Sequence, residues 1–399
     1  MEKYFNTPEF IATISCLVKS EINLDRLVYF KALEPAINEL ACEDLLNVIS
    51  AFVEKFIQQT SMIKNINDFD VILRSLNRSL ELLSKTYKNE VASQLTLENQ
   101  RVGGYFAILI HSYDPSGLSD LPSFAEKCIQ LFKISRREFS QEALGPFVNF
   151  MLFYIKKFYT NDEQCLNQVF ELLTKCYEHI HRFGVMAPCA QPLLVVCAMM
   201  SDSLDPQKFS THVSSFIRQA IVLLEERIPS TYQLKCLEGV VFCLYHVLSL
   251  SSDEFRMFCS NLEKVVRNFI SSTNQLAGLL HITNLYWLGD AKPERQSNVQ
   301  DDPVSVLRCL SESVSIIGLS IGNSHKLKLH IQLLQKCLYF IREKCQTVTP
   351  QFIDTVFTDA DKVLASIEDH DQNRGIIDHY NRIRRFYYST QTENESCLS

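Results

Sequence analysis

A short segment near the C-terminal end has the spacing of a serine nucleophile. Residues 318–322, GLSIG, match the GxSxG pattern, in which a sharp strand-to-helix turn exposes a serine hydroxyl above a parallel sheet. A hydrolase of this kind would pair Ser320 with an acid such as Asp354 and a base such as His370 or His379. The pattern requires a strand before the serine, but the preceding apolar residues follow a helical spacing. A helix ended by glycine and followed by another helix explains both glycines. We therefore favour two helices joined by a turn, with the Ser320 hydrolase as an alternative.

Metal ligation is the second chemistry that the residue types allow. Cys176, His179 and His181 are close in sequence, and the first two would share one face of a helix. No second pair of ligands at a suitable spacing accompanies them, so packing and surface roles are the better interpretation. The chain also has no HExxH, CxxC, GxxxxGK(S/T) or GxGxxG motif. We predict no catalytic, metal-binding or cofactor-binding residue, no cofactor and no enzymatic activity.

The elements that would position these residues are helices. Between His325 and Glu343, apolar residues recur at steps of four, three, four and three, which forms a stripe on one helix face. A second stripe beside it, containing Leu333 and Phe340, indicates that this helix packs on more than one side. Helices with such stripes are expected near residues 8–20, 35–59, 68–88, 90–112, 121–134, 139–160, 162–183, 188–201, 206–227, 229–250, 252–270, 274–288, 303–321, 325–343, 349–368 and 372–388.

Capping residues mark several of these helix starts. Asp205-Pro206, Asp302-Pro303 and Thr349-Pro350 each place a capping side chain directly before a proline, which has the φ angle of a first helical residue. Ser251 with Glu254 matches a capping box.

The spacing of the helices predicts the architecture. A pair of helices occupies about 45 residues, as in HEAT and armadillo repeats, and no glycine-rich or serine-rich linker divides the chain. We predict an all-α fold, a continuous HEAT/armadillo-like α-solenoid of antiparallel helix pairs. The polar stretch from Gly289 to Asp302 is then an insertion at the edge of the solenoid, which is either a mobile loop or a contact element.

Composition limits the partners and the compartment. The net charge of −7 gives no general attraction to phosphate, so nucleic acid is not an expected partner. The fourteen cysteines are spread through apolar stretches, which indicates buried thiols in a reducing compartment. No signal peptide is visible, and the longest apolar run, residues 193–200, is too short to cross a bilayer. We expect a cytoplasmic protein that contacts membranes only through its partners.

The last third of the chain resembles the C-terminal part of the large solenoid subunit of retromer, the vacuolar protein sorting-associated protein 35 family. The stretches HITNLYWLGD, VLRCLSESVSIIG and HIQLLQKCLYFIREKCQTVTPQFIDTV carry this resemblance in their order and spacing. It is fainter from residue 140 to 250, and residues 1–139 share only helical periodicity. The expected organisation is N-terminal helical repeats over 1–139, a C-terminal solenoid over 140–390 and a disordered tail over 391–399.

The resemblance implies a scaffold without enzymatic activity. Its C-terminal half would bind the small retromer subunit, which has a metallophosphoesterase-like fold, and support endosome-to-Golgi retrograde transport at the endosomal membrane. Family members are about twice as long and dock an arrestin-like subunit through a Pro-Arg-Leu-Tyr motif. This chain has only a partial match to that motif, DRLVY at residues 25–29. Whether the arrestin-like subunit is a second partner is therefore left open. A different HEAT-type cytosolic adaptor is the alternative.

Candidate contacts follow from the expected helix pairs. If the second helix of each pair lines one concave face, the partner-binding residues are Leu333, Phe340, Arg384 and Tyr387, with Trp287 from the preceding pair. Trp287 ends a periodic helix, so it also fits a role in closing the core beneath the polar loop, which we favour.

Overall fold

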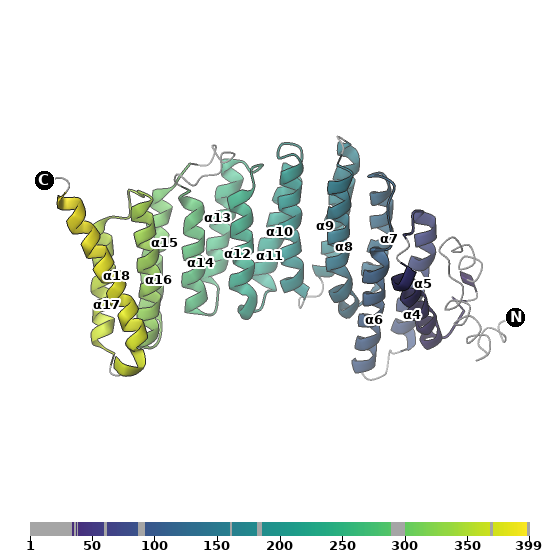
Figure 1. The fold of residues 1–399 in the computed structure, drawn as a ribbon, viewed down its shortest axis with the longest axis horizontal. Coiled ribbons are helices and arrows are strands. Elements are labelled where there is room, and N and C mark those ends of the chain that lie inside the picture. Colours follow the sequence, from purple (N-terminus) through teal and green to yellow (C-terminus); the bar gives the residue numbers. More distant parts are fainter. Residues whose placement is uncertain are drawn as a thin grey trace. The chain divides into compact units, whose positions relative to one another are not determined.

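The computed structural model describes residues 34, 35, 37, 39–59, 62–86, 92–159, 162–181, 186–288, 300–367 and 370–396. Apart from turns, these residues form helices, with one isolated β-bridge between Ile63 and Tyr113. The helices, labelled as in Figure 1, are α4 (Cys42–Gln59), α5 (Ile66–Thr86), α6 (Ala92–Ile110), α7 (Asp120–Ile134), α8 (Arg137–Lys157), α9 (Glu163–His181), α10 (Ala187–Leu204), α11 (Ser210–Glu226), α12 (Ser230–His246), α13 (Ser252–Arg267), α14 (Ser272–Tyr286), α15 (Pro303–Leu319), α16 (Asn323–Arg342), α17 (Pro350–Ala365) and α18 (His370–Ser396).

The chain divides into two compact units, Met1–His212 and Val213–Ser399, which we call the N-terminal unit and the C-terminal unit. The boundary between the two units lies in the first turn of α11. The predicted boundary at residue 139 marks where the family resemblance becomes weak, and it stays a prediction.

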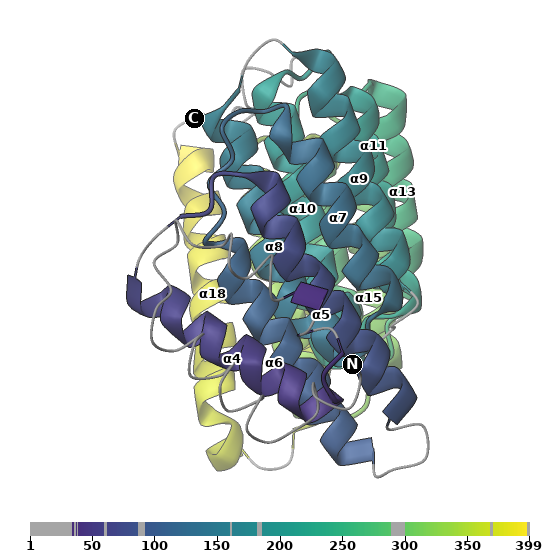
Figure 2. The same cartoon turned by 90° about the vertical axis from the view of Figure 1, so that its right-hand side faces the viewer.

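Each unit is a two-layer stack of helix pairs. In the C-terminal unit α12, α14, α16 and α18 pack one against the next, and α13, α15 and α17 pack against this row. In the N-terminal unit α6, α8 and α10 form one row and α5, α7 and α9 the other. Figure 2 shows α7 and α9 beside α8 and α10. Consecutive helices run antiparallel and most are joined by short turns, with the connection between α14 and α15 as the longest exception, so the predicted all-α, HEAT/armadillo-like fold is confirmed.

Side-chain caps set most of the predicted starts. Asp302 accepts a hydrogen bond from the Ser305 amide, Thr349 accepts one from the Phe352 amide, and Ser251 forms the predicted capping box with Glu254.

One predicted start is wrong. The Asp205 carboxylate accepts hydrogen bonds from the amides of Gln207 and Lys208, which holds residues 206–209 in a turn, and α11 begins at Ser210.

Two further predictions concern the ends of the chain. The helix expected at 8–20 lies outside the described residues. The tail expected to be disordered from residue 391 is helical as far as Ser396, because α18 continues through residues that include no glycine or proline to stop it.

Helix α10 is the one described helix whose length and apolar composition would allow a membrane span. Half of that segment is buried, and α10 packs against α8 in the N-terminal unit. This is the placement of a core helix in a folded protein.

Candidate partner-binding face

The GLSIG segment lies between two helices. Ser320 follows α15 rather than a strand, and its hydroxyl donates a hydrogen bond to the carbonyl of Ile316 one turn earlier. Gly322 has a φ of +86°, which is the glycine conformation expected between two helices. The proposed acid and base have other partners: Asp354 accepts from Tyr388, and the His379 ring pairs with Gln335. The strand-to-helix context of a nucleophile elbow is therefore replaced by the favoured helix–turn–helix.

The cysteine and histidine candidates also lie in a helix. Cys176 is fully buried in α9, and this burial raises the pKa of its thiol well above the ordinary value, which disfavours the thiolate that a metal would bind. Within the described part of the chain, no three His, Cys, Asp or Glu side chains converge on a point where they could hold a metal ion. Eleven of the twelve described cysteines are buried, as predicted for small apolar residues, and Cys189 is exposed.

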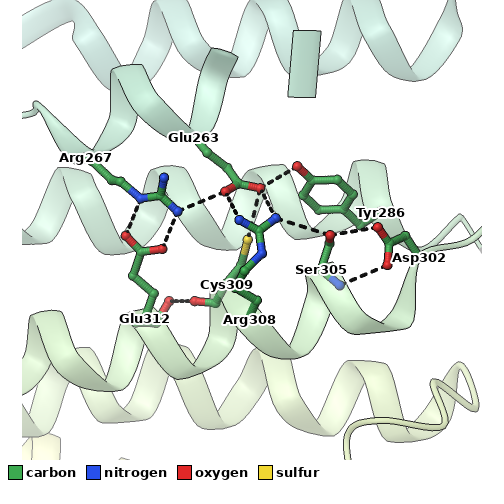
Figure 3. A network of polar contacts seen from close by, with 9 residues as sticks. Glu263, Arg267, Tyr286, Asp302, Ser305, Arg308, Cys309 and Glu312 are labelled. Atoms are coloured by element: carbon green, nitrogen blue, oxygen red, sulfur yellow. Dashed lines mark hydrogen bonds and ion pairs between the residues drawn. The ribbon is translucent and has the colours of Figure 1, made fainter. Parts of the chain in front are cut away.

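A buried carboxylate organises the centre of the C-terminal unit (Figure 3). Glu263 on α13 accepts two hydrogen bonds from the guanidinium of Arg308 on α15, Nη1 to Oε2 at 2.7 Å and Nη2 to Oε1 at 2.8 Å. Arg267 Nη2 donates to Oε2 at 3.0 Å, and the Tyr286 hydroxyl at the end of α14 donates to Oε1. Burial and this hydrogen bond raise the pKa of Tyr286 well above its usual range. One carboxylate thus joins three successive helices.

The network continues to the edge of the unit. Arg267 forms a two-point contact with Glu312, Nε to Oε1 at 2.6 Å and Nη2 to Oε2 at 2.8 Å, which ties α13 to α15. Arg308 donates to the Ser305 hydroxyl, which in turn donates to Asp302 at 2.7 Å. The network therefore ends at the residue that caps α15 (Figure 3).

The long polar stretch is closed at its base. Residues 289–299, most of the predicted edge insertion, lie outside the described residues. The residues on either side are joined, because the Asp302 amide donates to the Tyr286 carbonyl at 2.7 Å and the Leu288 amide donates to the Asp301 carboxylate at 2.8 Å. The segment therefore leaves and rejoins the helix stack at the same edge.

Large exposed aromatic side chains lie on two even-numbered helices of the C-terminal unit, α12 and α18. Phe242 on α12 and Phe386 on α18 are 54% and 60% exposed, and Tyr232 and Tyr388 are also exposed. On α13, α15 and α17 the exposed large apolar residues are aliphatic, and all but Met257 lie at helix ends. Aromatic side chains are enriched at protein interfaces, so we name the outward side of α12, α14, α16 and α18 the even-numbered face and take it as the candidate site.

Polar groups and a groove accompany these aromatics. On α12 and α14, Glu238 lies 3.2 Å from the His281 ring. A groove of about 480 Å³ runs between α16 and α18, with a mixed lining of amide, imidazole, guanidinium and apolar side chains from Gln335, Leu338, His379, Arg382, Ile383 and Phe386. The face therefore combines apolar anchors with polar groups, as protein-binding surfaces do.

Three of the predicted contact residues belong to the core, which corrects the predicted facing. Leu333 and Phe340 on α16 are fully buried. Tyr387 is buried against Phe357, and its hydroxyl donates to the Pro350 carbonyl. The error is one of rotation: adjacent helical residues differ by about 100°, and the exposed neighbours are Gln332 beside Leu333 and Phe386 beside Tyr387.

The other two predicted residues join elements within the unit. The half-buried Arg384 donates to Asp361 on α17 at 2.9 Å. The Trp287 indole N–H donates to the Glu343 carbonyl at the end of α16, so this half-buried ring links the end of α14 to the end of α16.

Sequence reasoning missed the residues that do reach the face. Phe242, Tyr339 and Phe386 were not among the contact residues predicted from the sequence. Lys336 is the residue with the clearest signal, because it is a lone cation inside the mainly apolar stretch IQLLQKCLYFI of residues 331–341. A charged side chain at such a position must lose its proton or pair with an opposite charge, which can come from a binding partner.

Comparison with known proteins gives a consistent family. The family model described as vacuolar protein sorting-associated protein 35 matches residues 6–360. The protein of that name from Schizosaccharomyces pombe is 20% identical over 200 residues, which are 50% of this chain and 23% of the yeast protein. A solved circular tandem repeat protein with novel repeat topology and enhanced subunit contact surfaces is 13% identical, with a TM-score of 0.43 over 94% of this chain and 91% of its own. Because the family model matches most of this chain, the chain belongs to the vacuolar protein sorting-associated protein 35 family.

Proposed function

We propose that the chain is a non-enzymatic scaffold subunit of a retromer-like complex that acts in endosome-to-Golgi protein transport. The observation that carries this proposal is the family match over residues 6–360 of a chain built from stacked helix pairs. The matched segment spans about a quarter of the yeast relative, so the partners and the transport role are inferred for this chain rather than transferred. We place it in the cytoplasm, on the endosomal membrane through its partners.

The proposed partner is the small retromer subunit with a metallophosphoesterase-like fold, bound on the even-numbered face. Phe242 and Phe386 supply apolar anchors, and the polar residues around them supply the rim that excludes water. The sequence lacks the Pro-Arg-Leu-Tyr motif, so direct binding of the arrestin-like subunit has no comparable support.

A binding experiment with matched variants tests this proposal. Tagged protein is mixed with the recombinant small subunit encoded by the same genome, and the dissociation constant is measured by titration calorimetry. Phe242→Asp should weaken binding at least tenfold, because a buried aromatic anchor contributes about 2 kcal/mol or more. Met257→Asp is the control, since Met257 is also exposed, at 37%, but lies on the odd-numbered helix α13.

The outcomes separate the two scaffold assignments. Binding of the small subunit that Phe242→Asp weakens and Met257→Asp leaves unchanged supports the proposal. If the wild-type chain does not bind the small subunit, the retromer assignment is wrong and a different HEAT-type adaptor becomes the better description. Localisation of the fluorescently tagged chain provides a second check, because recruitment to endosomes should require the small subunit or another partner.

A further inference from the structure

One lysine on the even-numbered face has no counterion among the residues that the structure describes. Lys336 lies on α16 between α14 and α18, and its ammonium donates a hydrogen bond to the Asn284 side-chain oxygen on α14. It lies 4.6 Å from the centre of the Tyr339 ring and 5.1 Å from that of Phe340. In the described part of the chain no carboxylate pairs with it. The cation therefore contacts one neutral amide and two aromatic rings.

The charged groups described below, on α12 and α14, do not supply a counterion for Lys336. On α14 the His281 ring faces Glu238 of α12, and burial lowers the pKa of His281, which leaves it neutral near pH 7. The positive charge of Lys336 lowers that pKa further. The Glu238 carboxylate contacts the His281 ring rather than the Lys336 ammonium.

Partial burial without a counterion is unfavourable for an ammonium group. Desolvation lowers the pKa of Lys336 to about 8. A methionine or leucine would fill the same position without this cost, so the lysine weakens the isolated chain. A group that is costly in the free protein and lies on an interaction face is expected to gain its counterion from the partner.

We propose that Lys336 is the specificity anchor of the even-numbered face, where it forms an ion pair with an aspartate or glutamate side chain of the small subunit. This inference rests on the proposed function and adds the chemistry of one contact. The Tyr339 ring beside the ammonium would exclude water from the pair. Because the chain carries a net charge of −7, an acidic partner surface is repelled elsewhere, and an isolated cation fixes where it can dock.

The experiment compares two lysines on one helix. Lys328 is an exposed lysine on the same helix, so Lys328→Met removes the same charge from a solvated position. Lys336→Met should weaken binding of the recombinant small subunit by about 30-fold or more, as expected when one partner of a desolvated ion pair is removed. Lys328→Met should change the dissociation constant less than threefold. The melting temperature of isolated Lys336→Met should equal or exceed that of the wild type, whereas a structural role for Lys336 would lower it.

A measurement on the wild-type chain tests the same contact without relying on the stability of a variant. An ion pair holds the proton on Lys336, so the affinity should fall by up to about tenfold between pH 8 and pH 9, where the free lysine loses its proton. Lys336→Arg keeps its charge and should show no such fall. Wild-type binding that Lys336→Met leaves unchanged, or that does not weaken above pH 8, overturns this inference and leaves the proposed function standing. If the wild-type chain does not bind the small subunit, both this inference and the proposed function are wrong.

Discussion

Glu263 shows how a single residue can define the register of a helix stack. Its carboxylate is almost fully buried and receives donors from Arg308, Arg267 and Tyr286. Buried ionic groups of this kind add little net stability compared with apolar packing, but they are satisfied in only one arrangement of the helices. The network therefore fixes how α13, α14 and α15 align beside the even-numbered face.

Removing the charge of Glu263 should destabilise the C-terminal unit. Glu263→Gln turns an amide donor toward the Arg308 donors, and we expect a loss of about 2–4 kcal/mol in the free energy of unfolding. Glu312→Gln is the control, because Glu312 belongs to the same network but is more exposed, and it should cost about 1 kcal/mol or less. Urea unfolding followed by circular dichroism measures both. Equal losses would show that Glu263 has no special role.

Lys336 makes a second residue-scale prediction, on the pH dependence of stability. Its pKa is lower in the folded chain, about 8, than the ordinary value of 10.5, so the folded state holds fewer protons between these values. The charged lysine therefore penalises the folded state below pH 8, and the penalty disappears as the pH rises to 10.5. Lys336→Met should be about 1–3 kcal/mol more stable than the wild type at pH 7. This difference should shrink to near zero at pH 10.5, and a difference that does not depend on pH would contradict the assigned cause.

At the scale of elements, the sequence predicted helices well and their faces unevenly. Asp302, Thr349 and Ser251 cap helices where the local chemistry requires, because a cap depends only on residues within one turn. The facing of α16 could not be read in the same way. It packs against α14, α15, α17 and α18, so apolar residues cover most of its circumference and no single stripe marks the buried side. Leu333 and Phe340 were placed on the wrong face for this reason.

Close packing between α6 and α8 gives an element-scale prediction with an internal control. A Cβ atom at Gly103 would lie 2.6 Å from the carbonyl oxygen of Phe139, a backbone atom that cannot move without shifting α8. Gly103→Ala should therefore destabilise the N-terminal unit by about 1–3 kcal/mol. The adjacent Gly104 has open space around it, so Gly104→Ala should be neutral or stabilise by up to about 1 kcal/mol. Thermal unfolding of the two variants decides, and equal effects would mean that the helices do not cross at Gly103.

At the scale of the whole molecule, each unit exposes apolar side chains on its own even-numbered helices. In the N-terminal unit these include Phe153 on α8 and Val196 on α10, at 61% and 44% exposure. Composition could not reveal this division, since both units have the same helical period and no linker marks the boundary near residue 212. Exposed apolar surfaces are candidate binding sites, and each unit has its own.

Substitutions in the two units test whether their binding functions are separate. Phe153→Asp and Phe242→Asp place the same charge at exposed phenylalanines on even-numbered helices of the N-terminal and C-terminal units. If the small subunit binds only the C-terminal unit, Phe153→Asp should leave its dissociation constant within about threefold of the wild type, while Phe242→Asp weakens it at least tenfold. The same calorimetric titration used for the proposed function measures both. Substitutions that share no partner have independent effects. A comparable loss in both variants would therefore show that the small subunit contacts both units.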